Sequence, residues 1–101
     1  MEKRELAQLC LNERLARQKQ LNDELAKANV ALAKAEFEEN MYAHLREHSN
    51  SKCMSDFAKI YEDVKKKVDK IDTENTSKIE SIKQSLRLIE EEIKYLQECI
   101  K

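Results

Sequence analysis

The second half of the chain carries an apolar stripe at helical spacing that extends from Phe57 to Ile100. Apolar residues recur there at steps of three and four, first as an eleven-residue repeat and then, from Ile79, as a seven-residue repeat. Such spacing places the apolar side chains on one face of a helix, so the stripe predicts a helix over residues 53–100. Its members are Phe57, Ile60, Val64, Val68, Ile71, Asn75, Ile79, Ile82, Leu86, Ile89, Ile93, Leu96 and Ile100.

The first half carries a thinner apolar stripe, which predicts another long helix over residues 2–47. Its members alternate steps of four and three, the heptad pattern of helices that pack side by side. Further upstream, leucines are interrupted by Gln18 and Asn22, so their register stays open. The stripe comprises Leu21, Leu25, Ala28, Leu32, Ala35, Glu39 and Tyr42, and the upstream leucines are Leu6, Leu9, Leu11 and Leu15.

A short polar segment, Glu47-His48-Ser49-Asn50-Ser51, separates the two patterns. Serine and asparagine favour caps and turns because their side chains bond to nearby backbone groups. We therefore predict a turn over residues 48–52, with Ser51 or Ser55 capping the second helix and Asn50 able to adopt the left-handed conformation. The two arms are nearly equal in length, as an antiparallel hairpin requires, and residue i is then expected beside residue 100 − i.

One weak point lies within the second stripe, at residues 72–77. This segment is poor in helix-forming residues, and Ser77 with Glu80 matches a capping box. It either ends one helix and starts a third, or forms a kink in one long helix. The unbroken repeat favours the continuous or kinked helix. Asn75 lies on the stripe, where it either sets the register of a buried seam or faces water in a frayed stretch.

The chain contains no glycine and no proline among its 101 residues. These two residues build tight turns and interrupt helices, so their absence favours a few long helices. We predict an all-α fold: an elongated antiparallel helical hairpin, or coiled coil of long helices, that forms a single domain over residues 1–101 and assembles into oligomers. A straight rod carries the same stripes and remains the alternative.

Charge and cysteine content narrow the classes of partner. The formal net charge is −1 and no basic surface is concentrated enough for phosphate binding, so we expect no nucleic-acid partner. No apolar stretch reaches the roughly 20 residues that span a bilayer, so a membrane partner is not expected. Cys10, Cys53 and Cys99 show neither zinc-pair spacing nor a disulfide framework, and Cys10 is expected near residue 90, away from Cys99. We therefore expect a reducing compartment, cytoplasmic or nuclear.

The candidate chemistry is sparse. His44 and His48 are four residues apart and share a helix face, a geometry that can hold zinc. Zinc sites usually use three or four protein ligands, so two histidines at a solvated tip predict no metal site; a pH-sensitive tip is their alternative role. No nucleophile has a base beside it and no glycine-rich loop is present. We expect no enzyme activity, no catalytic residues and no cofactor.

The strongest heptads lie at the C-terminal end and predict an interface with another chain. Leu88 and Tyr95 are seven residues apart and lie outside the main stripe, so they widen the apolar face. A single opposing helix is too narrow to cover this widened face. The predicted interface consists of Ile79, Ile82, Leu86, Leu88, Ile89, Ile93, Tyr95, Leu96 and Ile100.

These observations indicate a structural protein. The leading hypothesis is a non-enzymatic coiled-coil scaffold that forms homo- or hetero-oligomers and tethers or spaces partner proteins in the cytoplasm, cytoskeleton or nucleus. The alternative is reversible binding to a lipid surface, because eleven-residue amphipathic repeats also suit a helix lying in a membrane interface. The balanced polar face and the absence of tryptophan argue against lipid.

Overall fold

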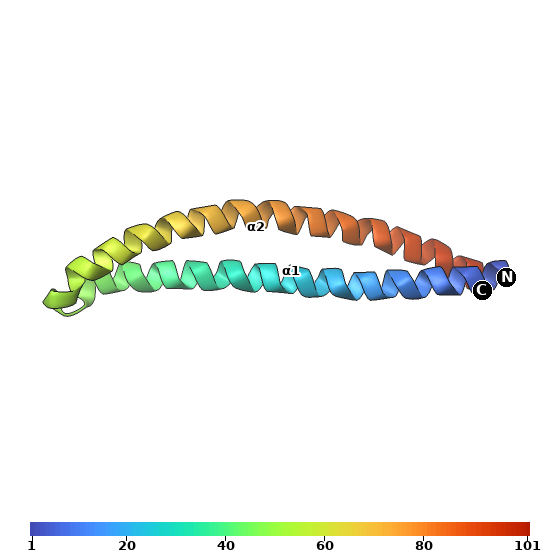
Figure 1. The fold of residues 1–101 in the computed structure, drawn as a ribbon, viewed down its shortest axis with the longest axis horizontal. Coiled ribbons are helices and arrows are strands. Elements are labelled where there is room, and N and C mark those ends of the chain that lie inside the picture. The colour runs from blue at the N-terminus through green and yellow to red at the C-terminus, as the bar shows by residue number, and fades with distance from the viewer. The chain divides into compact units, whose positions relative to one another are not determined.

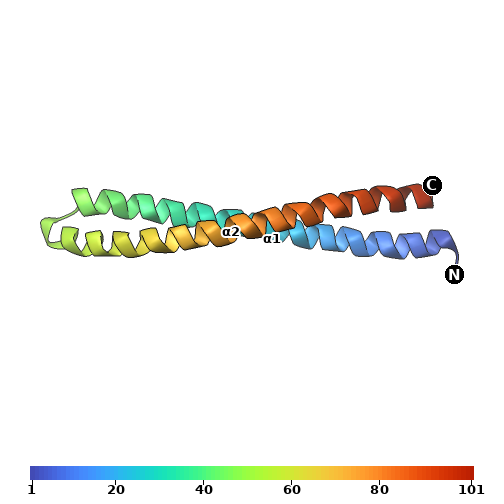
Figure 2. The same ribbon diagram turned by 90° about the horizontal axis from the view of Figure 1, so that it is seen from above.

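The computed structural model describes all 101 residues and consists of two α-helices with no strand. Helix α1 covers Lys3–His48 and helix α2 covers Ser51–Ile100. They run in opposite directions, so the predicted all-α antiparallel hairpin is confirmed (Figures 1 and 2). The observed helix ends lie within two residues of the predicted ones, 2–47 and 53–100.

The turn between the helices is shorter than predicted. Only Ser49 and Asn50 separate α1 from α2, and no residue of the chain has a positive φ. The expected left-handed asparagine is therefore wrong. Asn50 instead caps α2: its side-chain Oδ1 accepts a hydrogen bond from the backbone N–H of Lys52 at 3.0 Å, and its carbonyl oxygen accepts from the N–H of Cys53 at 2.8 Å. The cap lies one residue before Ser51, the nearer of the two predicted caps.

Helix α2 passes through residues 72–77 without a break, so the three-helix alternative is wrong. In the segment's middle, Asn75 is half-buried and its side-chain amide donates a hydrogen bond to the backbone carbonyl of Ala28 at 3.2 Å. The asparagine therefore faces the opposing helix rather than water. A polar group placed at such a seam favours one alignment of the two helices over others.

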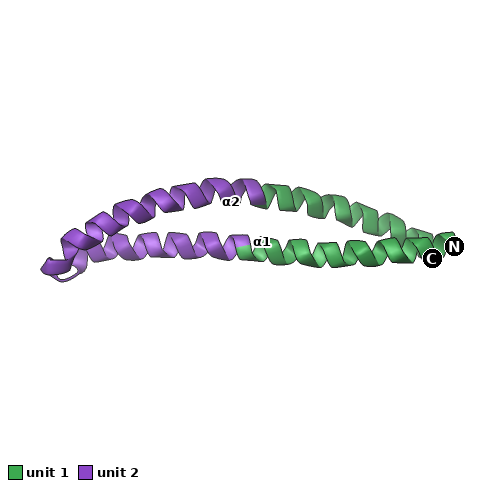
Figure 3. Cartoon of the chain, in the orientation of Figure 1, with its two compact units in different colours: residues 1–27, 79–101 green, residues 28–78 purple.

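The chain divides into two compact units (Figure 3). Unit 1 comprises residues 1–27 and 79–101, which join the beginning of α1 to the end of α2. Unit 2 comprises residues 28–78 and contains the turn.

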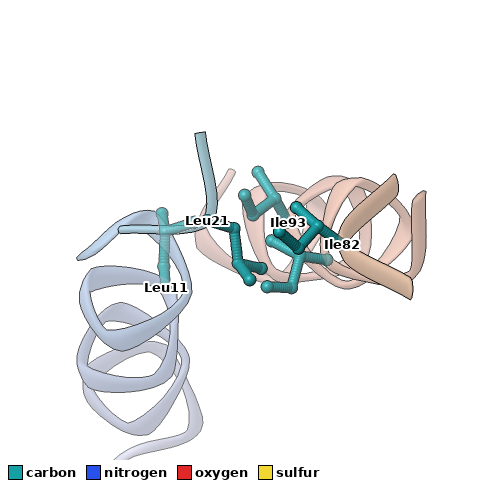
Figure 4. Packing of buried hydrophobic residues seen from close by; sticks show 5 residues of the cluster. Leu11, Leu21, Ile82 and Ile93 are labelled. Carbon is teal, nitrogen blue, oxygen red and sulfur yellow. The ribbon is translucent and has the colours of Figure 1, made fainter. Parts of the chain in front are cut away.

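Unit 1 holds the hydrophobic core cluster. Leu11 and Leu21 of α1 pack against Ile82, Ile89 and Ile93 of α2, and Figure 4 shows Leu21 pointing toward the isoleucines. Leu25, Leu86, Leu96 and Ile100 pack around this cluster.

The open register upstream in α1 is now defined. The α1 positions turned toward α2 continue backward from Leu21 in steps of three and four, through Gln18, Arg14, Leu11 and Ala7. All of them are buried or half-buried. The heptad seam therefore extends over the whole of α1, although three of its positions, Arg14, Gln18 and Glu39, are polar. The other upstream leucines, Leu6, Leu9 and Leu15, remain exposed.

Unit 2 packs through Ala28 and Val68, its two buried apolar residues. Closer to the turn, the rings of Tyr42 and Phe57 lie with their centroids 6.1 Å apart. Tyr61 is half-buried, with the Arg46 guanidinium 4.1 Å from its ring centroid.

Ile60, which the eleven-residue repeat places in the seam, is exposed. The inward positions of α2 run instead from Phe57 through Tyr61 and Val64 in heptad steps. The eleven-residue repeat survives only around Asn75, where two four-residue steps follow each other. Such a stutter locally unwinds a coiled coil.

The register departs from the expected 100 − i within unit 2. Tyr42 meets Phe57, one residue from the expected position, but Asn75 bonds to Ala28 instead of residue 25. Val68 shares a groove with Ala35 instead of residue 32, the same offset of three residues that the Asn75–Ala28 bond shows. Helix α2 is therefore displaced by about three residues relative to the expected alignment over this part of unit 2.

Candidate interaction surface

The structure places most of the predicted interface inside unit 1. Ile82, Ile89 and Ile93 are buried against α1, whereas Ile79, Leu86, Leu96 and Ile100 are half-buried. Leu88 and Tyr95 are the two predicted residues that stay exposed, at 58% and 65%. The α1 seam, extended upstream by Leu11 and Ala7, explains why so much of the stripe is covered by the chain itself.

A groove lies beside Tyr95, between the two helices of unit 1. It has a volume of about 470 Å³ and is lined by Cys10, Arg14, Glu91, Glu92, Tyr95 and Leu96. A smaller groove of about 180 Å³ shares Cys10, Tyr95 and Leu96 and adds Lys3, Leu6, Ala7 and Cys99. Because the two grooves share three residues, they form one continuous face, which we call the unit 1 groove.

An ion pair crosses the unit 1 groove. The Nε of Arg14 lies 3.4 Å from a carboxylate oxygen of Glu92, and both side chains are partly exposed. Arg14 belongs to the α1 seam, so its stem packs between the helices while its charge reaches the rim. A partly exposed pair of this kind contributes little to stability, but it places opposite charges at a defined point of the groove.

Helix α2 carries a second seam along this groove. Leu88, Glu92, Tyr95 and Cys99 follow one another at steps of four, three and four, parallel to the buried seam. A helix with two adjacent seams has the pattern needed to pack against two neighbours at once. One neighbour is α1 of the same chain, which leaves the second seam available.

Another exposed apolar face lies on α1 in unit 2, where the sequence analysis predicted none. Val30 and Phe37 are 66% and 71% exposed, and Met41 follows at the exposed end of the same face. Ala33 lies between Val30 and Phe37, at steps of three and four. We call these four residues the α1 outer face. The spacing of these residues was visible in the sequence. The stronger stripe from Leu21 to Tyr42, on the opposite side of the helix, was the only apolar face predicted for α1.

The thiols lie partly where expected. All three cysteines are free, and Cys53 is exposed in the first turn of α2. The expected separation of Cys10 from Cys99 is wrong, because both line the smaller part of the unit 1 groove. Within unit 1, Cys10 lies beside Tyr95 and Leu96 instead of residue 90.

The two histidines lie together at the end of α1. The ring centroids of His44 and His48 are 4.6 Å apart with 35° between the ring planes, and both side chains are exposed. The Nε2 of His48 lies 3.9 Å from a carboxylate oxygen of Glu47. No group of three or more histidine, cysteine, aspartate or glutamate side chains is arranged to hold a metal ion.

Comparison with protein-family models, with curated proteins and with solved structures finds no match for this chain. Neither helix contains an apolar stretch of the length and hydrophobicity that a membrane-crossing segment needs. Function must therefore be inferred from the surfaces of the hairpin itself.

Proposed function

We propose that this chain is a non-enzymatic structural coiled-coil module that oligomerises and tethers or spaces partner proteins in a larger intracellular assembly, cytoplasmic or nuclear. The observation that carries the proposal is the exposed second seam of α2 beside the unit 1 groove. Leu88 and Tyr95 expose large apolar areas at heptad spacing, next to a helix pair that is already packed. Apolar residues arranged in this way usually mark a contact surface.

The occupant that best fits the unit 1 groove is a helix from a second copy of the chain. A groove between two helices that lie side by side accepts the side-chain ridge of a third helix. The exposed leucines of α1 and the second seam of α2 supply matching ridges, so each copy offers both a groove and a helix to fill one. The charges of Arg14 and Glu92 at the rim would select the alignment of the incoming helix, as flanking charges do in coiled coils.

Lipid binding is the competing function, and the packing lends it less support. The apolar stripe of α2 on which it rests is turned toward α1, with Val68, Ile82, Ile89 and Ile93 all buried. An interfacial helix would have to give up this packing to insert the same side chains into lipid. Sedimentation with anionic vesicles separates the two functions, because the assembly module stays in the supernatant.

The assembly test compares Leu88→Asp with the wild-type chain by light scattering over a range of concentrations. A charge in a desolvated contact is costly, so the variant is expected to lose the higher-mass species. Because Leu88 is exposed in the hairpin, its replacement leaves the helical circular dichroism signal unchanged. Lys83→Asp, an exposed change on the same helix, is the matched control and retains the wild-type mass.

Ile89→Asp distinguishes assembly from folding. Ile89 is buried in the core of unit 1, so a charge there destabilises the hairpin whether or not a second chain binds. Leu88→Asp should lower only the mass of the assembly, whereas Ile89→Asp should lower that mass and also the unfolding midpoint. If the wild-type chain is monomeric at high micromolar concentration, or if Leu88→Asp keeps the wild-type mass, the proposed assembly through this seam is wrong.

A further inference from the structure

We propose that His44 and His48 form a chelating site for a divalent transition-metal ion on the surface of α1, with Cu²⁺ bound most tightly. The sequence contains only two histidines, too few for a usual zinc site, and so predicts no metal site. The observed arrangement of the two rings leads to a different conclusion. This site is separate from the unit 1 groove, because its residues belong to unit 2 and the groove does not include them.

The geometry of the two imidazoles suits a shared metal ion. Residues four apart on a helix lie one above the other on the same face. Here the ring centroids are 4.6 Å apart and the planes differ by 35°. A metal ion bound by two imidazole nitrogens at about 2.0 Å each requires rings at close to this spacing. Rotation of two exposed side chains is sufficient to converge one nitrogen of each ring on the ion.

The surroundings also favour a cation. His48 is the last residue of α1, and the carboxyl end of a helix carries a partial negative charge. The Glu47 carboxylate lies 3.9 Å from the Nε2 of His48 and adds a formal negative charge. The Arg46 guanidinium is held over the Tyr61 ring and lies 3.8 Å from Glu47. A metal ion between the histidines would therefore lie near the Glu47 carboxylate, whose charge Arg46 neutralises only in part.

The number of ligands indicates the class of metal. Structural zinc sites use four protein ligands in a closed tetrahedron, and no such group exists in this chain. Two imidazoles leave the remaining coordination positions to water. With nitrogen ligands, affinity rises from Mn²⁺ to Cu²⁺ and falls again at Zn²⁺, so Cu²⁺ is expected first, followed by Ni²⁺.

The experiment titrates the full chain with Cu²⁺ in a weakly coordinating buffer. It uses a background in which Cys10, Cys53 and Cys99 are replaced by serine, so that no thiol binds or reduces the metal. We expect one Cu²⁺ per chain, with electron paramagnetic resonance showing hyperfine coupling to two imidazole nitrogens. His44→Ala and His48→Ala should each weaken binding at least tenfold, since changes in outer-shell partners alone cost about 10- to 100-fold.

A relocated histidine supplies the matched control. The double variant Met41→His with His44→Ala keeps two histidines on the same exposed face of α1. Its imidazoles are now seven residues apart, about 10 Å along the helix, which is beyond chelating reach. This variant should bind as weakly as the single-histidine variants and should lose the coupling to the second nitrogen. Binding as tight as in the parent, or single variants of unchanged affinity, would overturn the site.

Discussion

At the scale of single residues, leucines of one helix have opposite environments. Leu21 is 2% exposed and packs among the isoleucines of α2, whereas Leu9, on the same helix and in the same unit, is 50% exposed. The heptad seam decides between them, because Leu21 falls on it and Leu9 does not. Burial, rather than residue type, therefore sets what each leucine contributes to stability.

Replacing Leu21 by alanine tests this distinction. The change removes methyl groups from the core of unit 1 and leaves a cavity, so we expect a loss of about 2–5 kcal/mol in the free energy of unfolding. Leu9→Ala, the same substitution at an exposed position, should change it by no more than about 0.5 kcal/mol. Urea unfolding followed by circular dichroism measures both variants, at a concentration too low for assembly. Similar losses would contradict the assigned register of α1.

At the scale of elements, the sequence predicts the two helices well because apolar periodicity extends over many turns. The continuity of α2 could be predicted for the same reason. The helix cap could not, since Asn50 and Ser51 both have capping side chains and only the backbone path decides which one is used. The inward position near the turn was likewise ambiguous, because Ile60 and Tyr61 are adjacent and Ile60 fits the repeat better than Tyr61 does.

The register of the two helices could not be predicted from equal arm lengths. Equal lengths locate the turn, whereas the alignment of the two helices depends on how their side chains pack. The cross-helix bond from Asn75 to Ala28 shows an offset of three residues from the expected pairing in unit 2. Within unit 1 the pairing also departs from 100 − i, because Cys10 lies beside Tyr95 and Leu96, so the expected separation of Cys10 from Cys99 was wrong.

The cap assignment leads to a second prediction. In Asn50→Ala, the backbone N–H of Lys52 loses its side-chain acceptor, and the free energy of unfolding should fall by about 1 kcal/mol. Ser51→Ala, one residue later, should leave it within about 0.5 kcal/mol of the wild-type value. Thermal unfolding by circular dichroism provides the comparison. An equal or larger effect at Ser51 would show that Ser51, the residue predicted from the sequence, caps α2 instead of Asn50.

At the scale of the whole molecule, a tether or spacer needs more than one contact surface. The unit 1 groove is one, and the α1 outer face of unit 2 is another. The two surfaces share no residue and belong to different units. A helix that is apolar on opposite sides is typical of one that is covered on both. Because α2 covers one side of α1 in unit 2, the opposite side is left for a further chain.

Two substitutions, made singly and together, test whether the surfaces act independently. Phe37→Asp places a charge on the α1 outer face, where Phe37 is 71% exposed, and Leu88→Asp places one beside the unit 1 groove. If each surface binds a separate neighbour, either variant alone should form smaller assemblies than the wild type, and the double variant should be monomeric by light scattering. Ala31→Asp, an exposed change away from the α1 outer face, is the control and should retain the wild-type mass. A Phe37→Asp variant that assembles like the wild type would restrict the contacts to the unit 1 groove, and a chain with only one contact surface would link copies in pairs instead of spacing partners along a larger assembly.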